Sequence, residues 1–206
     1  MSELQVWPSP FVFWTEVENH EEIKNTYLSK IKNESIEEKY HVTPGKINRV
    51  EGEAPSVWRC EVTTSYFHRK ELKDFFSEEI IESIVKKPLS KLYEHERCPV
   101  PVKAKKHILK EIWFNTYKPG YFQEMHDHNG TTFSGIYLLE LNEPNTTKFT
   151  CYNRSSHHYD QSVTSYYTTE HIKEGNVILF PSEFAHSVDI CSTEKASISF
   201  NVLCEW

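Results

Sequence analysis

The sequence lacks several features that would direct a protein to a membrane, to nucleic acid or to a disulfide-stabilised fold. None of its apolar runs reaches the length needed to span a bilayer. Its 30 acidic residues outnumber its 23 basic residues, and the net charge of −7 argues against a general nucleic-acid surface. The five cysteines are an odd number with no C-x-x-C pair, and no signal-peptide pattern precedes them. We therefore expect a cytoplasmic protein that binds neither nucleic acid nor membrane.

The composition fits one globular domain spanning residues 1–206. Hydrophobic residues make up 38% of the chain and charged residues 26%, which is typical of a soluble protein that folds alone. This length is near the upper end for a single hydrophobic core, so one domain has to carry the function. We expect residues 1–106 to provide a strand and helical support, and residues 107–206 to form a β-rich core.

The first half of the chain is predicted to be mainly helical. Pro8 to Thr15 is rich in Phe, Val and Trp and predicts a first strand. Apolar residues at helical spacing predict a helix from His20 to Asn33, with Asn19 as its cap. The polar stretch from Glu34 to Pro55 contains glycines and prolines and predicts an exposed loop. A helical apolar pattern from Arg69 to Glu96, interrupted by one proline, predicts two or three helices packed on a sheet.

The second half has the pattern of an all-β sandwich or barrel. Runs rich in Ile, Val, Phe, Tyr and Thr are separated by turn-forming residues. Because helices precede strands, we expect the helices to buttress one face of the sheet. The predicted strands are Glu111–Tyr117, Thr132–Glu140, Lys148–Tyr152, Ser162–Thr168, Asn176–Phe180 and Ser197–Leu203.

The triplet His126-Asp127-His128 is the most informative candidate site. Residues i and i+2 of an extended strand point to the same side, so His126 and His128 can chelate one metal ion while Asp127 faces away. Neutral imidazole suits Fe, Zn, Cu or Ni, so the pair alone does not select the metal. A structural or surface role is the alternative, and it is the role we expect for His157 and His158.

A third histidine follows a buried strand later in the chain. Gly175 supplies a turn, the apolar run Val177–Phe180 predicts the strand, and Pro181 bends the chain before His186. This arrangement can deliver a third ligand from a neighbouring strand and leave open positions on the metal. We therefore predict that the two earlier histidines and His186 are the metal ligands and the catalytic residues.

These elements resemble the iron(II) and 2-oxoglutarate-dependent oxygenases, in particular a prolyl-hydroxylase-like group of marine bacteria and phages. The resemblance implies an α+β fold with a double-stranded β-helix, a jelly-roll or cupin-like barrel buttressed by N-terminal helices. It also implies iron(II), 2-oxoglutarate and molecular oxygen. The matching stretches are Trp113-Phe114-Asn115, Gly120 to His128, Ser134 to Tyr137, Phe180 to Ser182 with His186, and Ser197 to Asn201.

The resemblance further implies a binding site for the cosubstrate. In the superfamily a basic residue shortly after the last histidine ligand pairs with the far carboxylate of 2-oxoglutarate, and Lys195 stands in that place. Lysine offers a point-charge contact where an arginine would offer a bidentate fork. Ser197 lies on the same strand face and can add a hydroxyl. The alternative is that Lys195 is an exposed lysine in a turn.

Two positions depart from the superfamily pattern. Most members bind iron with two histidines and a carboxylate, whereas His128 replaces the carboxylate and leaves the site one negative charge short. Relatives also carry two tyrosines in succession, of which Tyr137 is present while Leu138 replaces the second. We expect Tyr137 to contact the cosubstrate, and the missing hydroxyl to be supplied by another polar residue: Asn115, Tyr117 or Tyr121.

The activity that the resemblance implies is decarboxylation of 2-oxoglutarate coupled to hydroxylation of a C–H bond in a peptide or amino-acid side chain, with proline as one candidate acceptor. A homodimer is compatible with this activity. A cupin-type dioxygenase or isomerase is an alternative that would not need 2-oxoglutarate, although the glutamate expected shortly after His128 is absent. A catalytically silent barrel used as a binding module is a second alternative, and it would hold no stoichiometric metal.

Overall fold

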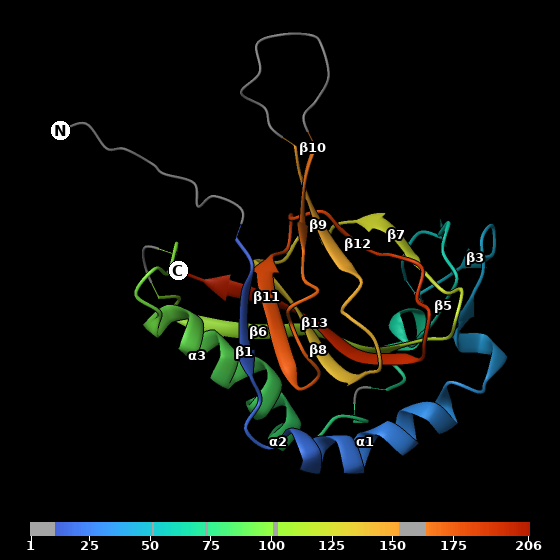
Figure 1. Ribbon diagram of the computed structural model, residues 1–206, viewed down its shortest axis with the longest axis horizontal. Helices are drawn as coiled ribbons and strands as arrows, with labels where there is room; N and C mark the ends of the chain where they lie inside the picture. Colours follow the sequence, from blue (N-terminus) through green and yellow to red (C-terminus); the bar gives the residue numbers. More distant parts are fainter. Residues whose placement is uncertain (1–10, 51, 73, 101–102, 153–163) are drawn as a thin grey trace, which may run out of the picture.

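The computed structural model describes residues 11–50, 52–72, 74–100, 103–152 and 164–206, which form two main antiparallel sheets (Figure 1). The larger sheet contains, in spatial order, β1 (Phe13–Glu16), β11 (Asn176–Pro181), β8 (Phe133–Leu141), β13 (Lys195–Glu205), β6 (Lys106–Tyr117), β5 (Val62–Thr64) and β2 (His41–Val42). The smaller sheet contains β10 (Thr164–Thr168), β9 (Thr147–Tyr152), β12 (His186–Val188) and β7 (Gln123–His126). A separate hairpin pairs β3 (Ile47–Asn48) with β4 (Ser56–Val57).

Helices lie against one face of the larger sheet (Figure 1). They are α1 (His20–Glu34) and a continuous stretch of α2 (Glu78–Ile81), π-helical η3 (Glu82–Lys86) and α3 (Lys87–Glu94), with 3₁₀ turns at η1 (Glu38–Tyr40) and η2 (Tyr66–His68). Ile31 and Ile84 from the helices are fully buried with Phe114 from the sheet. The helices therefore buttress the sheet as predicted. None of the described helices is long and apolar enough to cross a membrane.

The central strand β13 divides its residues between two environments. Ile198 and Val202 join the helix-side core, whereas Lys195, Ser197 and Ser199 line a cavity between the two sheets. This division follows from the two-residue period of a strand. All five residues are at least 94% buried, so the cavity side of β13 carries buried polar groups. Such groups require partners or a ligand.

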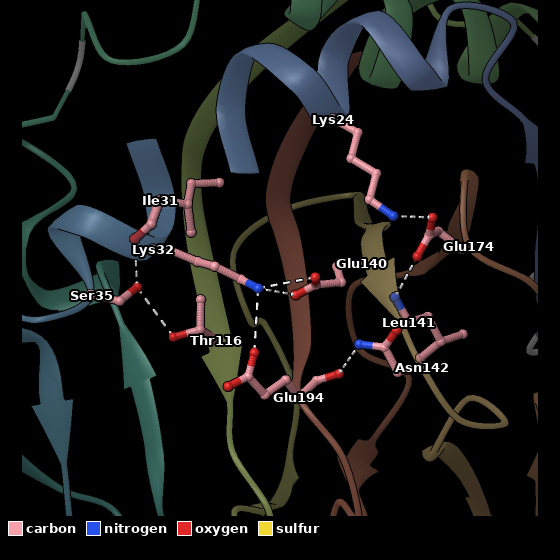
Figure 2. Close-up of polar contacts among 10 residues, drawn as sticks. All are labelled: Lys24, Ile31, Lys32, Ser35, Thr116, Glu140, Leu141, Asn142, Glu174 and Glu194. Atoms are coloured by element: carbon pink, nitrogen blue, oxygen red, sulfur yellow. Dashed lines mark hydrogen bonds and ion pairs between the residues drawn. The ribbon is translucent and has the colours of Figure 1, made fainter. Parts of the chain in front are cut away.

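Ion pairs connect α1 to the end of β8 and to the loops around it (Figure 2). Lys32 lies 2.9 Å from a carboxylate oxygen of Glu140 and 3.3 Å from one of Glu194, the residue before β13. Lys24 pairs with Glu174 in the loop before β11. These contacts join segments that are distant in sequence, and they fix the helix over the start of β13.

The six strands predicted for the second half correspond to β6, β8, β9, β10, β11 and β13. The predicted helix at His20 is also present, but the side chain of Asn19 makes no capping hydrogen bond. Three parts of the predictions lie outside the described residues: the start of the first strand, the start of the strand at 162–168, and His157 with His158.

The prediction of an exposed loop from Glu34 to Pro55 was only partly right, because residues 52–55 are exposed but the earlier part of the segment packs against the protein. This segment contains η1, β2 and β3, and both Tyr40 and Val42 are about 1% exposed. β2 pairs with β5 and so extends the larger sheet. Strands of two residues are too short to show a periodic pattern, so no local signal in the sequence predicts them.

Candidate metal centre

Three histidines meet at one end of the space between the two sheets. His126 ends β7 and His186 begins β12, and the two residues are direct partners across the strands. His128 follows β7, and its backbone N–H donates to the carbonyl of Ser182 at 2.8 Å. One nitrogen from each imidazole lies within 4.8 Å of the others. The structure thus brings together the three histidines that the sequence analysis selected.

Backbone carbonyls orient two of the three rings. His126 Nδ1 lies 2.8 Å from the carbonyl oxygen of Glu124, and His186 Nδ1 lies 3.2 Å from that of Phe184. A ring that donates Nδ1–H to a carbonyl keeps the lone pair of Nε2 available for a metal. Each of these two histidines is therefore oriented by the carbonyl two residues before it.

The third ring, His128, is held by side chains. Its Nδ1 lies 3.4 Å from Nδ2 of Asn201, and the same amide nitrogen donates to Glu111 Oε2 at 2.7 Å. Glu111 Oε1 pairs with Arg69 at 2.7 Å. The indole of Trp113 lies 5.6 Å from the His128 ring, measured between centroids. A carboxylate is thus present near His128, but it is separated from the ring by an amide.

Burial keeps these imidazoles in the neutral form that coordinates metals. Desolvation is the largest cause of the lowered pKa of His126 and of His186, and it lowers the pKa of His128 to about 3. The charge of a neighbouring histidine adds to this effect at His128 and His186. The donor set suits a divalent transition metal, and by itself it does not separate iron from zinc.

A buried lysine faces the same cavity. Lys195 is 2% exposed, and its Nζ donates to Asn145 Oδ1 at 3.0 Å and to Thr147 Oγ1 at 3.4 Å. Its Nζ also lies 5.4 Å from the centroid of the Tyr117 ring. No carboxylate of the described residues forms an ion pair with it, and desolvation lowers the pKa of Lys195 to about 8. Glu143 interacts with Lys195 electrostatically without forming an ion pair. A buried cation without an ion-pair partner is costly, so this position suits an anionic ligand.

We call the space between the three histidines and Lys195 the inner cavity. Asn115 and Ser197, two other residues that the sequence analysis assigned to the cosubstrate site, also line it. Asn115 accepts a hydrogen bond from Thr64 Oγ1 at 2.7 Å and donates to Ser199 Oγ at 3.0 Å. The cavity measures about 20 Å³, which is room for a water molecule. An anion as large as 2-oxoglutarate therefore requires side chains to move.

Tyr137 does not reach the inner cavity, which corrects the prediction of a cosubstrate contact. Ser134 and Ile136 of β8 line the cavity, so the alternation of the strand turns Tyr137 to the opposite face. Its hydroxyl lies 2.6 Å from Nδ1 of His20 in the helix-side core, and Nε2 of His20 lies 3.2 Å from Glu174. The two-residue period of a strand was an available signal, because neighbouring residues such as Ile136 and Tyr137 point to opposite faces of the sheet.

The partners of Lys195 were not predicted from sequence. Asn145 and Thr147 come from the segment that leads into β9, and both are about 1% exposed. Thr147 shares a strand face with Phe149, so the two-residue alternation was an available signal. Gln123 was also missed: it lines the inner cavity and accepts a hydrogen bond from the hydroxyl of Tyr117 at 2.9 Å.

A second pocket, which we call the outer pocket, opens on the other side of His126 and His128. Its volume is about 280 Å³. It was not predicted, because most of its walls come from the region around η2 and β4. Its principal lining residues besides the histidines are Glu53, Trp58, Tyr66, Phe67, Trp113 and Asp127.

Residues 111–201 match a family model described as "Putative 2OG-Fe(II) oxygenase". This segment contains the three histidines and Lys195, together with Asn115 and Ser197. The residues of the outer pocket that precede β6 lie outside it. A search of curated protein sequences finds no match to this chain.

Several solved structures share the fold. A Trichoplax adhaerens prolyl hydroxylase in complex with a hypoxia inducible factor peptide fragment has a TM-score of 0.55 and 11% identity, over 94% of this chain and 83% of that one. The viral collagen prolyl hydroxylase of Paramecium Bursaria Chlorella virus-1, in a 2OG complex, has a TM-score of 0.52 and 13% identity, over 95% and 96%. The alpha ketoglutarate dependent carbocyclase SnoK from nogalamycin biosynthesis has a TM-score of 0.56 and 9% identity, over 94% and 79%.

At these identities the structural likeness establishes the fold alone, and it confirms the predicted double-stranded β-helix. The family match adds the chemistry of the segment that carries the histidines. Residues 111–201, less than half of the chain, are thus similar to the 2OG-Fe(II) oxygenases, and the three histidines among them could hold a metal ion. This similarity supports an oxygenase that uses iron(II), 2-oxoglutarate and molecular oxygen.

Proposed function

We propose that this protein is an iron(II) and 2-oxoglutarate-dependent dioxygenase that hydroxylates a peptide or amino-acid side chain. The observation that carries the proposal is the set of residues that line the inner cavity. Three neutral histidines and a buried lysine without a carboxylate partner line the same space. A metal accounts for the histidines, and an anionic ligand of that metal accounts for Lys195.

Six residues that line the inner cavity have a role in this proposal. His126, His128 and His186 hold the iron. The ammonium group of Lys195 pairs with the carboxylate of 2-oxoglutarate that lies away from the metal. Ser197 and Asn115 are further polar contacts on the same wall. Because the cavity is small in this structure, Lys195 must exchange its hydrogen bonds to Asn145 and Thr147 for contacts to the cosubstrate.

The net reaction converts the acceptor R–H, 2-oxoglutarate and O₂ into R–OH, succinate and CO₂. The oxygen molecule gains four electrons, two from oxidation of 2-oxoglutarate and two from the acceptor. One oxygen atom enters succinate and the other enters the hydroxyl group. When bound, the iron supplies the activation of oxygen. The protein residues bind, orient and exclude water.

The replacement of a carboxylate ligand by His128 changes the charge of the site. Three neutral ligands leave both positive charges of iron(II) uncompensated by the protein. The two carboxylates of 2-oxoglutarate then carry the neutralising charge, and Glu111 is connected to His128 through the amide of Asn201. We therefore expect the metal to be held more firmly when the cosubstrate is present.

A peptide or amino-acid side chain, with proline as one candidate, is the acceptor that the resemblance favours. Two of the similar structures are prolyl hydroxylases, and one of them was solved with a peptide fragment. The carbocyclase has the same fold, so the fold does not select the acceptor. The acceptor has to be inferred from the outer pocket.

Succinate formation by the iron-loaded protein tests the proposal. We expect 2-oxoglutarate to be consumed with one succinate per CO₂, and Lys195→Met to raise the Michaelis constant for 2-oxoglutarate about ten- to a hundredfold, since a charge-assisted hydrogen bond contributes about 1.5–3 kcal/mol. Lys110→Met, at an exposed lysine of β6, is the matched control. Turnover of another substrate without 2-oxoglutarate would support a cupin-type enzyme, and absence of stoichiometric metal would support a binding module.

A further inference from the structure

The outer pocket adjoins the metal ligands and has walls of a defined chemistry. Four aromatic rings line it, two of them beside the histidines. Trp58 lies 6.5 Å from the ring of His126 with an interplanar angle of 22°, and Trp113 lies 5.6 Å from the ring of His128. The pocket therefore has one indole beside each of the two metal ligands that line it.

The aromatic walls form one continuous cluster. Ring centroids are 4.6 Å apart for Trp58 and Phe67, 5.5 Å for Trp58 and Tyr66, and 5.1 Å for Tyr66 and Trp113. Packed rings of this kind offer flat apolar faces with negative electrostatic potential at their centres. They suit an aliphatic stem, and they also attract a cation.

The charged residues that line the outer pocket are acidic. Glu53 and Asp127 line it, and no lysine or arginine of the described residues does. Glu53 is already paired with Arg69 at 2.8 Å. Asp127 accepts a hydrogen bond from Asn129 at 2.8 Å and pairs with no cation in the part of the chain that the structure describes. Asp127 is therefore the carboxylate that remains for a ligand.

The protein itself places a cation against one wall of this cluster. The guanidinium of Arg69 lies 4.2 Å from the centroid of Tyr66 and is held by Glu53 and Glu111. Aromatic faces and carboxylates thus stabilise a buried positive charge just behind the pocket. Aromatic rings and a carboxylate also line the outer pocket itself, at Trp58, Trp113 and Asp127.

We propose that the outer pocket receives a positively charged amino-acid side chain, a lysine or arginine of a peptide. Its aliphatic stem lies along Trp58 and Trp113, and its charged end pairs with Asp127. The inference that this side chain is the one oxidised rests on the proposed function, whereas its binding does not. A neutral proline ring would also pack on the tryptophans, but it would gain nothing from Asp127.

Binding of capped pentapeptides to the full metal-free chain tests the proposal by calorimetry. The probes are Gly-Gly-Lys-Gly-Gly and the same peptide with norleucine or proline in place of lysine. We expect the lysine peptide to bind about tenfold more tightly than either neutral one, and the difference to shrink as salt is added. Equal or tighter binding of the norleucine or proline peptide would overturn the proposal.

Variants locate the binding site. Asp127→Asn should weaken the lysine peptide about threefold and leave the norleucine peptide unchanged. Glu79→Gln, which removes an exposed carboxylate on α2, is the matched control and should change neither. Trp58→Leu should weaken both peptides. If Asp127→Asn has no more effect than Glu79→Gln, the assignment of the charged end is wrong.

The two proposals fail separately. Lys195→Met should leave binding of the lysine peptide to the metal-free chain intact, because Lys195 faces the inner cavity. Absence of succinate formation in the presence of tight lysine-peptide binding would reject the oxygenase function and keep the recognition site. Succinate formation without any preference for the charged peptide would keep the oxygenase function and reject the recognition site.

Discussion

The two spaces on either side of the histidines differ in size, wall and origin. The inner cavity measures about 20 Å³ and is lined by polar side chains from paired strands, with Lys195 almost fully buried. The outer pocket measures about 280 Å³ and has aromatic walls, three of which come from Trp58, Tyr66 and Phe67 in and before η2. The inner cavity lies mostly within the segment that matches the oxygenase family, and most of the outer pocket lies before it.

Under the proposed function, this difference separates the part of the site that binds the cosubstrate from the part that selects the acceptor. Strand pairing fixes Lys195, Ser197 and Asn115 relative to one another, since β13 and β6 are neighbours in register. A cosubstrate common to a superfamily suits walls of this kind. Short turns and two-residue strands leave more freedom for variation, which suits an acceptor that differs between enzymes. Substitutions in the inner cavity should therefore change cosubstrate binding, and substitutions in the outer pocket should change acceptor binding.

The largest expected effect is that of His186→Ala, which removes the metal ligand that lines the inner cavity but not the outer pocket. Two remaining donors should hold iron(II) at least a hundredfold more weakly, since altering even the partners of metal ligands costs 10- to 100-fold. Anaerobic titration with elemental analysis measures the loss. His126→Ala and His128→Ala should behave alike. Full iron stoichiometry in the His128 variant would contradict the three-histidine site and return attention to Asp127.

A smaller effect is expected for His128→Asp, which introduces the carboxylate that most of the superfamily carries. Aspartate is shorter than histidine, so its oxygen stops about 1 Å short of the imidazole nitrogen, and ligand distances tolerate only about 0.2 Å. Asn201 and Trp113, which contact the His128 ring, cannot contact a carboxylate in the same way. We expect partial iron retention and about tenfold slower succinate formation. A variant faster than the parent at equal iron occupancy would show that the pocket is not adapted to three histidines.

The pH dependence of cosubstrate affinity is the next effect in size. Desolvation lowers the pKa of Lys195 to about 8, so its ammonium form is present below pH 8 and is lost as the pH rises. Affinity for 2-oxoglutarate should therefore be constant below about pH 7 and should fall about fivefold between pH 8 and 9. Anaerobic calorimetry measures it. Lys195→Arg keeps its charge and should flatten the profile, and an unchanged profile in that variant would assign the titration to another group.

The smallest expected effect is that of Trp58→Leu on the inner cavity. The indole lies on the outer side of His126, so iron stoichiometry and the affinity for 2-oxoglutarate should change less than about twofold, while the affinity for the lysine peptide falls. Thermal unfolding controls for the loss of packing against Phe67. A large change in cosubstrate affinity in a well-folded variant would mean that the two spaces act as one.

The sequence by itself determined the elements with strong local patterns. Alternating β-branched and aromatic residues predicted the strands of the second half, and helical spacing predicted α1. The pair His126 and His128 follows from the geometry of an extended chain, and His186 follows from the turn, strand and proline bend that precede it. Lys195 was selected by a family resemblance. These features depend on neighbours in sequence, or on spacing along one strand, so no tertiary information was needed.

Only the tertiary structure decided what surrounds these residues. It turned Tyr137 toward His20, gave Lys195 the partners Asn145 and Thr147, and brought Trp58 beside His126 across more than sixty residues of sequence. Each of these contacts depends on which strands pair and in which register. Strand pairing and register depend on burial of the whole core and on closure of long loops, so they cannot be predicted from a local sequence pattern.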